Sequence, residues 1–63
     1  MPIVQVKLYE NELSNVQESG LIANITDAVC KSTREELRPA VWVVVEGVRA
    51  SRWGIAGRAG SDA

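Results

Sequence analysis

The spacing of apolar residues changes near residue 14. Between positions 3 and 9, apolar and polar residues alternate, and Val4, Val6 and Leu8 fall on one side of an extended chain. This alternation is typical of a strand with one buried face. Beyond residue 14, apolar residues recur at the spacing of one face of a helix. That helical stripe consists of Val16, Leu21, Ile22, Ile25, Ala28 and Val29.

Capping and turn residues mark the boundaries of the remaining elements. Ser14 and Gln17 have the spacing of a capping box, so we expect a helix that begins after Ser14 and ends near residue 33. A polar connection at 34–39 leads to a continuous apolar run at 40–46, which is typical of a strand buried on both faces. Strand, helix and strand form a right-handed βαβ unit with parallel strands. Gly54 and Gly57 predict a tight turn or short hairpin, and residues 59–63 a flexible tail.

The chain is short enough that its size limits its stability. Its 63 residues form a single small domain, which is marginally stable alone. Small scaffolds usually gain stability from disulfides, a metal or association. Cys30 is the only cysteine, so no internal disulfide can form, and we expect it to pack as a small buried side chain. There is no histidine and no cysteine cluster, so we expect neither a metal site nor a cofactor. Association remains, and the sequence therefore predicts an oligomer.

Charge and hydropathy argue against two classes of partner. The formal net charge is −1 with both signs spread along the chain, which does not resemble the basic patch of a nucleic-acid-binding protein. The longest apolar run, at 40–45, is far too short to span a membrane. No signal peptide is visible before the first strand, and a single thiol is typical of a reducing compartment. We therefore expect a cytoplasmic protein that binds neither nucleic acid nor membranes.

Pro2 is the residue with the clearest chemical potential. It directly follows Met1, and removal of Met1 would leave a prolyl secondary amine at the start of the chain. An α-amino group titrates at about 7.7–8.0, and burial in an apolar pocket lowers that pKa, so the amine can act as a base near neutral pH. If Met1 is retained, the nitrogen of Pro2 is part of a tertiary amide and cannot act as a base. The other interpretation is an ordinary proline at the open end of an edge strand, where no N–H is needed. Position alone leaves both interpretations open.

Three features together resemble the 4-oxalocrotonate tautomerase family of the tautomerase superfamily. They are the start Met1-Pro2-Ile3, the βαβ unit, and the segment Trp53-Gly54-Ile55-Ala56-Gly57 near the end. The resemblance covers nearly the whole chain and implies one tautomerase-like domain over residues 1–63, with Met1 removed. The implied fold class is α/β (α+β): a βαβ tautomerase fold with parallel strands and a short C-terminal hairpin, assembled as dimers into a hexamer.

The resemblance also implies an activity. Pro2 would be the catalytic general base of an isomerase that moves a proton between carbon and oxygen of a 2-hydroxydienoate or similar enol acid, in the degradation of aromatic compounds. A secondary amine in a dry pocket can abstract a proton and return it elsewhere. An arginine that holds the carboxylate of the substrate would orient it and stabilise the developing enolate.

The chain departs from the family at both expected arginines. The family has Glu-Gly-Arg after the first strand, where this chain has Glu10-Asn11-Glu12, and a second arginine where this chain has Trp42. One explanation is a heterohexamer in which this chain is a non-catalytic or partly catalytic subunit and its partner supplies the arginines. The other is that Arg52, Arg49 or Arg38 binds the substrate carboxylate, with Arg52 as the first candidate. Each of these arginines can also be an ordinary solvated surface charge.

The two tryptophans and two carboxylates have further interpretations. Trp53 occupies the position of a family aromatic that walls the pocket, although large aromatics also anchor interfaces. Trp42 could bind substrate by filling the space of the missing arginine. A related activity, a haloacrylate dehalogenase or hydratase, would need a water-activating carboxylate beside Pro2, for which Glu46 and Glu12 are the candidates.

Overall fold

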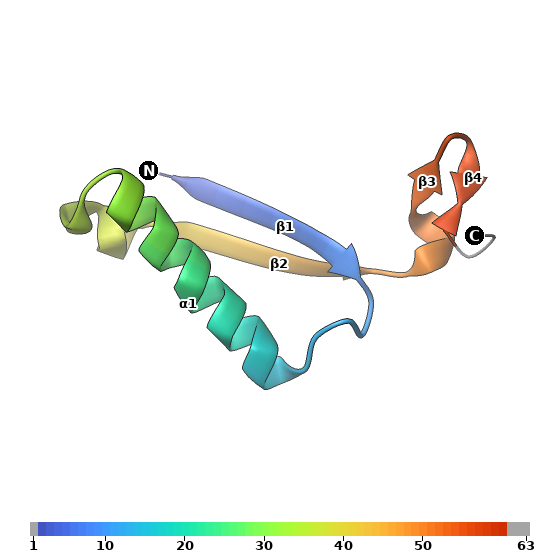
Figure 1. The fold of residues 1–63 in the computed structure, drawn as a ribbon, viewed down its shortest axis with the longest axis horizontal. Coiled ribbons are helices and arrows are strands. Elements are labelled where there is room, and N and C mark those ends of the chain that lie inside the picture. Colours follow the sequence, from blue (N-terminus) through green and yellow to red (C-terminus); the bar gives the residue numbers. More distant parts are fainter. Residues whose placement is uncertain (1, 61–63) are drawn as a thin grey trace.

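The computed structural model describes residues 2–60, arranged as strand, helix, strand and hairpin (Figure 1). The elements are β1 Ile3–Tyr9, α1 Asn15–Ser32, the 3-10 helix η1 Glu35–Ala40, β2 Trp42–Val48, the 3-10 helix η2 Ala50–Arg52, β3 Gly54–Ile55 and β4 Arg58–Ala59. The predicted βαβ unit and C-terminal hairpin are confirmed. The first strand has the predicted bounds.

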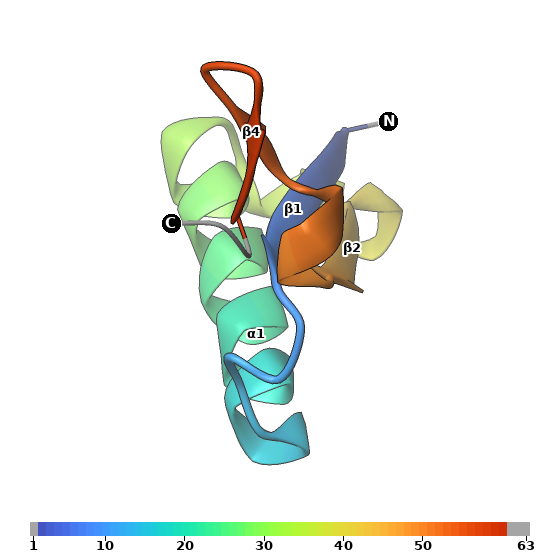
Figure 2. The same cartoon turned by 90° about the vertical axis from the view of Figure 1, so that its right-hand side faces the viewer.

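The two long strands form a parallel pair covered on one face by α1. Their register runs from Ile3 opposite Trp42 to Tyr9 opposite Val48. The apolar side chains of β1 predicted to face inward are half-buried, and the residues between them are exposed. Figure 2, which looks along the strands, shows α1 on one side of the pair. The side chains of Ile3, Trp42 and Val44, on the face turned away from α1, are exposed. The sheet therefore has one covered face and one open face.

The ends of α1 follow the predicted capping chemistry. The N–H of Gln17 donates to Oγ of Ser14 at 3.2 Å, and the N–H of Ser14 donates to Oε1 of Gln17 at 2.9 Å. At the other end, the N–H of Thr33 donates to the carbonyl of Val29 at 3.0 Å. These bonds satisfy backbone groups that a helix terminus leaves without a partner. The capping box and the end of the helix near residue 33 are confirmed.

The apolar stripe of α1 is narrower than predicted. Cys30 is the most buried residue, with 4% of its surface exposed, which confirms its predicted packing. The prediction is wrong for Val16, which is 82% exposed, and for Ile22 and Ala28, which also face outward. A sheet of two strands offers a narrow surface, so it covers only the central line of the helix. That line consists of Leu21, Ile25, Val29 and Cys30.

The second strand differs from its prediction in bounds and in burial. It runs over Trp42–Val48 rather than 40–46, and the predicted polar connection before it contains the helix η1. Its burial alternates: Trp42 is 56% exposed and Val44 is 47% exposed, on the face that α1 does not cover. The apolar run is therefore not buried on both faces within one copy of the chain, because the second face has no covering layer.

The C-terminal hairpin closes through a tight turn and is anchored to the strand ends. Ala56 and Gly57 both have positive φ, 54° and 81°, as a two-residue hairpin turn of the favoured twist requires. The Trp53 ring packs against Tyr9 with centroids 4.8 Å apart, and its indole N–H donates to the carbonyl of Val48 at 3.2 Å. The predicted tail starts too early, because Ala59 lies in β4 and residue 60 bonds to Trp53. Residues 61–63 lie outside the described part.

Candidate active site

Pro2 lies at the open start of the parallel strands. It is half-buried, and its carbonyl accepts the N–H of Trp42 at 3.0 Å, which extends the ladder by one bond beyond β1. The carbonyl side of Pro2 is thus held in the sheet, whereas its nitrogen takes no part in the ladder. Met1 is outside the described residues. Of the predicted site residues, the structure brings Pro2 and Trp42 together at this end.

A second set of predicted site residues lies at the opposite end of the strands, around an open hollow of about 370 Å³. Arg49 caps the start of η2 and Arg52 ends it, with the N–H of Arg52 donating to the carbonyl of Arg49 at 2.9 Å. Arg49 has extended backbone geometry before the turn, and both arginines line the hollow. Within residues 2–60, neither arginine forms an ion pair.

Two carboxylates and a lysine complete the charged lining of this hollow. Nζ of Lys7 lies 2.7 Å from Oε1 of Glu46, and this hydrogen bond, with the charge of Lys7, lowers the pKa of Glu46. Both side chains are exposed, so the pair contributes little to stability. Glu10 is the other carboxylate that lines the hollow. Three cations and two carboxylates leave an excess positive charge there, with two guanidinium groups available to an anion.

The two sets are far apart within one copy of the chain. β1 and β2 each have seven residues and run parallel, so the start and end of the pair are about 20 Å apart at the usual strand rise. Figure 1 shows the start of β1 at one end of the molecule and η2 with the hairpin at the other. A single copy therefore does not bring Pro2 together with Arg49, Arg52 or Trp53.

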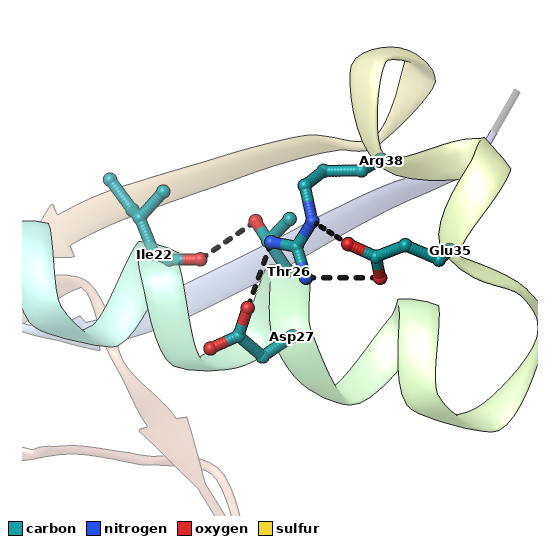
Figure 3. A network of polar contacts seen from close by, with 5 residues as sticks. All are labelled: Ile22, Thr26, Asp27, Glu35 and Arg38. Atoms are coloured by element: carbon teal, nitrogen blue, oxygen red, sulfur yellow. Dashed lines mark hydrogen bonds and ion pairs between the residues drawn. The ribbon is translucent and has the colours of Figure 1, made fainter.

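Trp53 and Arg38 have structural partners in this chain. Trp53 is half-buried and anchors the hairpin through Tyr9, so within one copy its ring does not wall the surroundings of Pro2. Figure 3 shows Arg38 extending from η1 between two carboxylates. Its Nε and Nη2 lie 2.7 and 3.2 Å from the oxygens of Glu35, and its Nη1 lies 2.8 Å from Oδ1 of Asp27.

The Arg38 network binds η1 to α1 and occupies the guanidinium. The hydrogen bonds to Glu35 and Asp27 raise the pKa of Arg38 further above its usual value, and Arg38 lowers the pKa of Glu35. This makes Arg38 a poorer candidate for the substrate carboxylate than Arg49 or Arg52. The three-residue spacing of Glu35 and Arg38 could have predicted their ion pair. The contact with Asp27 could not be predicted in this way, because Asp27 is eleven residues away on another element.

The carboxylates considered for water activation also lie away from Pro2. Glu46 is four residues along β2 from Trp42, about 13 Å at the usual rise, and it is paired with Lys7. Glu12 lines a smaller hollow after the end of β1. The sequence analysis did not identify Lys7, which lines the larger hollow, or Tyr9, which packs against Trp53. The only signal for them was the alternation of β1, which places both residues on the open face.

Within residues 2–60, no three or more His, Cys, Asp or Glu side chains form a group that could hold a metal. Over the same part of the chain, no helix combines the length and apolar character needed to cross a membrane.

Comparison with known proteins gives one consistent family. The family model described as "Tautomerase enzyme" matches residues 2–63. A Staphylococcus aureus protein named "probable tautomerase" is 44% identical over 62 residues, which cover 98% of each chain.

Two solved structures superpose over nearly their full length. One is a candidate 4-oxalocrotonate tautomerase from methicillin-resistant Staphylococcus aureus, with a TM-score of 0.83 and 39% identity over 97% of this chain and 95% of that one. The other is YwhB, a homologue of 4-oxalocrotonate tautomerase, with a TM-score of 0.85 and 27% identity over 98% of each chain. This chain therefore has the same fold as these proteins, in addition to its sequence similarity to them.

Proposed function

This chain belongs to the Tautomerase enzyme family, and from that premise we propose that it is an isomerase whose Pro2 amine moves a proton between oxygen and carbon of a small enol or dienol acid. Membership of this family supports a tautomerase-type isomerase activity for the chain. The identity of the base and the class of substrate, a 2-hydroxydienoate or similar carboxylate, are our proposal.

The observation that carries the proposal is the setting of Pro2. Its carbonyl is held by the N–H of Trp42 at 3.0 Å, while its nitrogen is not needed by the sheet. Removal of Met1 would therefore create an oriented amine without loss of a ladder hydrogen bond. The Pro2 ring is half-buried, and burial in apolar surroundings lowers the pKa of an amine and keeps more of it unprotonated.

The chemistry follows from such an amine. It accepts the hydroxyl proton of the enol while the C=O bond forms, and the resulting ammonium group returns the proton to carbon as the C=C bond is lost. General acid–base catalysis of this kind contributes about 10²- to 10⁴-fold to a rate. The reaction needs no cofactor. A guanidinium that binds the carboxylate would hold the substrate in place and favour the enolate-like transition state.

We place this activity in an oligomer. The chain exposes 4920 Å², whereas a compact monomer of 6.8 kDa exposes about 3,950 Å². Its radius of gyration is 14.5 Å, whereas a compact domain of its length has about 10.6 Å. The excess surface is comparable to the roughly 800 Å² that each partner buries in a stable interface. The family resemblance suggests a hexamer of βαβ dimers, which native mass spectrometry of the purified protein would test.

A second candidate is a subunit that completes a heterohexamer without turning over substrate by itself. It is favoured by the turn Glu10-Asn11-Glu12, which has no arginine. A dehalogenase or hydratase is less well supported, because Glu46 is paired with Lys7 and lies away from Pro2.

Ketonisation of a simple 2-hydroxydienoate by the purified chain, with and without Pro2→Ala, tests the main proposal. Intact mass would first establish whether Met1 has been removed. We expect turnover by the wild type and a loss of about 10²-fold or more in the variant, with assembly unchanged. Equal rates would refute the role of Pro2. No turnover by a folded wild type that lacks Met1 would favour the partner-subunit function.

A further inference from the structure

Arg38 joins η1 to α1 through its side chain. Its Nη1 lies 2.8 Å from Oδ1 of Asp27 on α1, and its other two bonds go to Glu35 within η1 (Figure 3). Of the ion pairs in residues 2–60, the pair with Asp27 alone connects these two elements. A guanidinium held by two carboxylates keeps one orientation, so Arg38 fixes the position of η1 relative to α1.

The backbone of Arg38 leads directly to the Pro2 end of the strands. The carbonyl of Arg38 accepts the N–H of Val41 at 3.2 Å, and the next residue, Trp42, donates its N–H to the carbonyl of Pro2 at 3.0 Å. Pro39 lies between them with a restricted φ, so η1 passes a displacement on instead of absorbing it. Figure 1 shows η1, the end of α1 and the start of β1 at the same end of the molecule. Three consecutive contacts therefore connect α1 to Pro2.

The bond between Trp42 and Pro2 controls the direction of the Pro2 nitrogen. Pro2 precedes β1, and this bond holds its carbonyl in place. Once the carbonyl is fixed, rotation about one backbone bond, Cα–C, is left to move the ring nitrogen. A catalytic base must lie within hydrogen-bond reach of its proton, and a misplacement of about 1 Å can cost about 10²-fold in rate. A residue that secures this carbonyl therefore affects the rate without contacting the substrate.

We propose that Arg38 is a positioning residue, which through its bond to Asp27 holds the start of β2 against Pro2 and so directs the Pro2 amine toward the substrate. This role rests on the proposed function of Pro2. It differs from binding of the substrate carboxylate by Arg38, and the two roles have different kinetic effects. Loss of a contact with the substrate raises KM, whereas loss of positioning lowers kcat and leaves KM nearly unchanged.

Asp27→Asn and Glu35→Gln form a matched pair of variants. Each removes one negative charge beside the same guanidinium, but only Asp27 lies on α1, so a difference between the two variants isolates the connection to that helix. In the ketonisation assay, Asp27→Asn should lower kcat about three- to tenfold with KM within about twofold of the wild type, and Glu35→Gln should lower kcat less. Arg38→Lys keeps a charged contact and should recover part of the rate lost in Arg38→Gln. Arg34→Gln should match the wild type, because Arg34 is exposed and in no ion pair within residues 2–60.

Hydrogen exchange reports on the bond to Pro2 directly. The amide of Trp42 is the donor, so its protection should fall about three- to tenfold in Asp27→Asn. The amide of Gly60, which donates to the carbonyl of Trp53 in the hairpin at the other end of the molecule, should keep its protection. If Arg38 had a merely structural role, both amides or neither would lose protection, and kcat of the folded protein would not change.

Combining Asp27→Asn with Arg38→Gln should lower kcat no further than Arg38→Gln alone, because both substitutions remove the same contact. Selective loss of protection at Trp42 together with a lower kcat supports the proposal. Unchanged protection and kcat in Asp27→Asn overturn it, while an inactive Pro2→Ala variant still supports the proposed function. A raised KM with unchanged kcat in Arg38→Gln also overturns it, because Arg38 would then bind the substrate. Equal rates for the wild type and Pro2→Ala, or an inactive wild type, overturn both.

Discussion

Replacing Gly60 with alanine is expected to loosen the C-terminal hairpin from the end of the strands. A Cβ at this position would lie 2.9 Å from the carbonyl oxygen of Ala50 and 3.0 Å from the hydroxyl oxygen of Tyr9. The nearer atom belongs to the backbone, so rotation of a side chain cannot relieve the contact. The N–H of Gly60 donates to the carbonyl of Trp53 at 2.8 Å, and a shift of the hairpin would weaken this bond.

The expected effect follows from these contacts. Overpacking of a well-packed site costs about 1–3 kcal/mol. The lost backbone hydrogen bond is worth about 1 kcal/mol, but the same displacement of the hairpin causes both effects, so they do not add. A local destabilisation of 1–3 kcal/mol corresponds to a fall of about 5- to 150-fold in the protection of the Gly60 amide against hydrogen exchange.

Native-state hydrogen exchange followed by NMR measures this protection, with the wild type and the variants compared at the same protein concentration. Gly54→Ala is the matched control, because it lies in the same hairpin and a Cβ there meets nothing within 4 Å. We expect the control to retain the protection of the wild type. Equal protection in the two variants would refute the close packing of Gly60 against Ala50.

Three further substitutions test local features of the chain. Gly20→Ala should stabilise the protein by up to about 1 kcal/mol in urea unfolding, because the position is helical and a Cβ meets nothing within 4 Å; a loss of stability would contradict this open setting. Ser14→Ala should cost about 1 kcal/mol by the same measurement, whereas Ser14→Asp keeps a capping acceptor and should cost less; equal losses would argue against the capping box. Glu35→Gln should lower the Tm at neutral pH and flatten its decline in acid. Arg38 holds the pKa of Glu35 below its ordinary 4.5, so this stabilisation is fully present above about pH 4.5 and is lost as the pH falls through the lowered value; an unchanged acid profile would refute it.

Much of the fold is predictable because it depends on near neighbours in the chain. Alternation fixes which residues of β1 face the helix, and the spacing of Ser14 and Gln17 fixes where α1 begins. The short hairpin follows in part from Gly57, since a positive φ is available to glycine without strain, whereas its neighbour Ala56 adopts a positive φ that its residue type does not signal. Predictions fail where a distant partner decides the outcome, as for Val16, which is apolar and helical in spacing yet has no strand beside it.

The residues of the candidate site also differ in whether near neighbours or distant partners decide their role. Pro2 could be identified from the sequence, because its chemistry depends only on its place at the start of the chain and on the family resemblance. Which arginines form ion pairs could not be identified from the sequence. Arg38 is engaged because the fold brings Asp27, eleven residues away, to the same side of α1 as η1, whereas Arg49 and Arg52 are left facing a hollow.

By itself, the sequence determined the order of strand, helix, strand and hairpin, because these depend on periodicity, capping and turn residues. The resemblance of its motifs indicated the family and the candidate base. Only the tertiary structure decided which face of the sheet stays open and how far apart the site residues lie. The physical reason is the parallel crossover: it places both strand starts at Pro2 and both strand ends at the arginines, about 20 Å away. No local pattern in the chain encodes that distance.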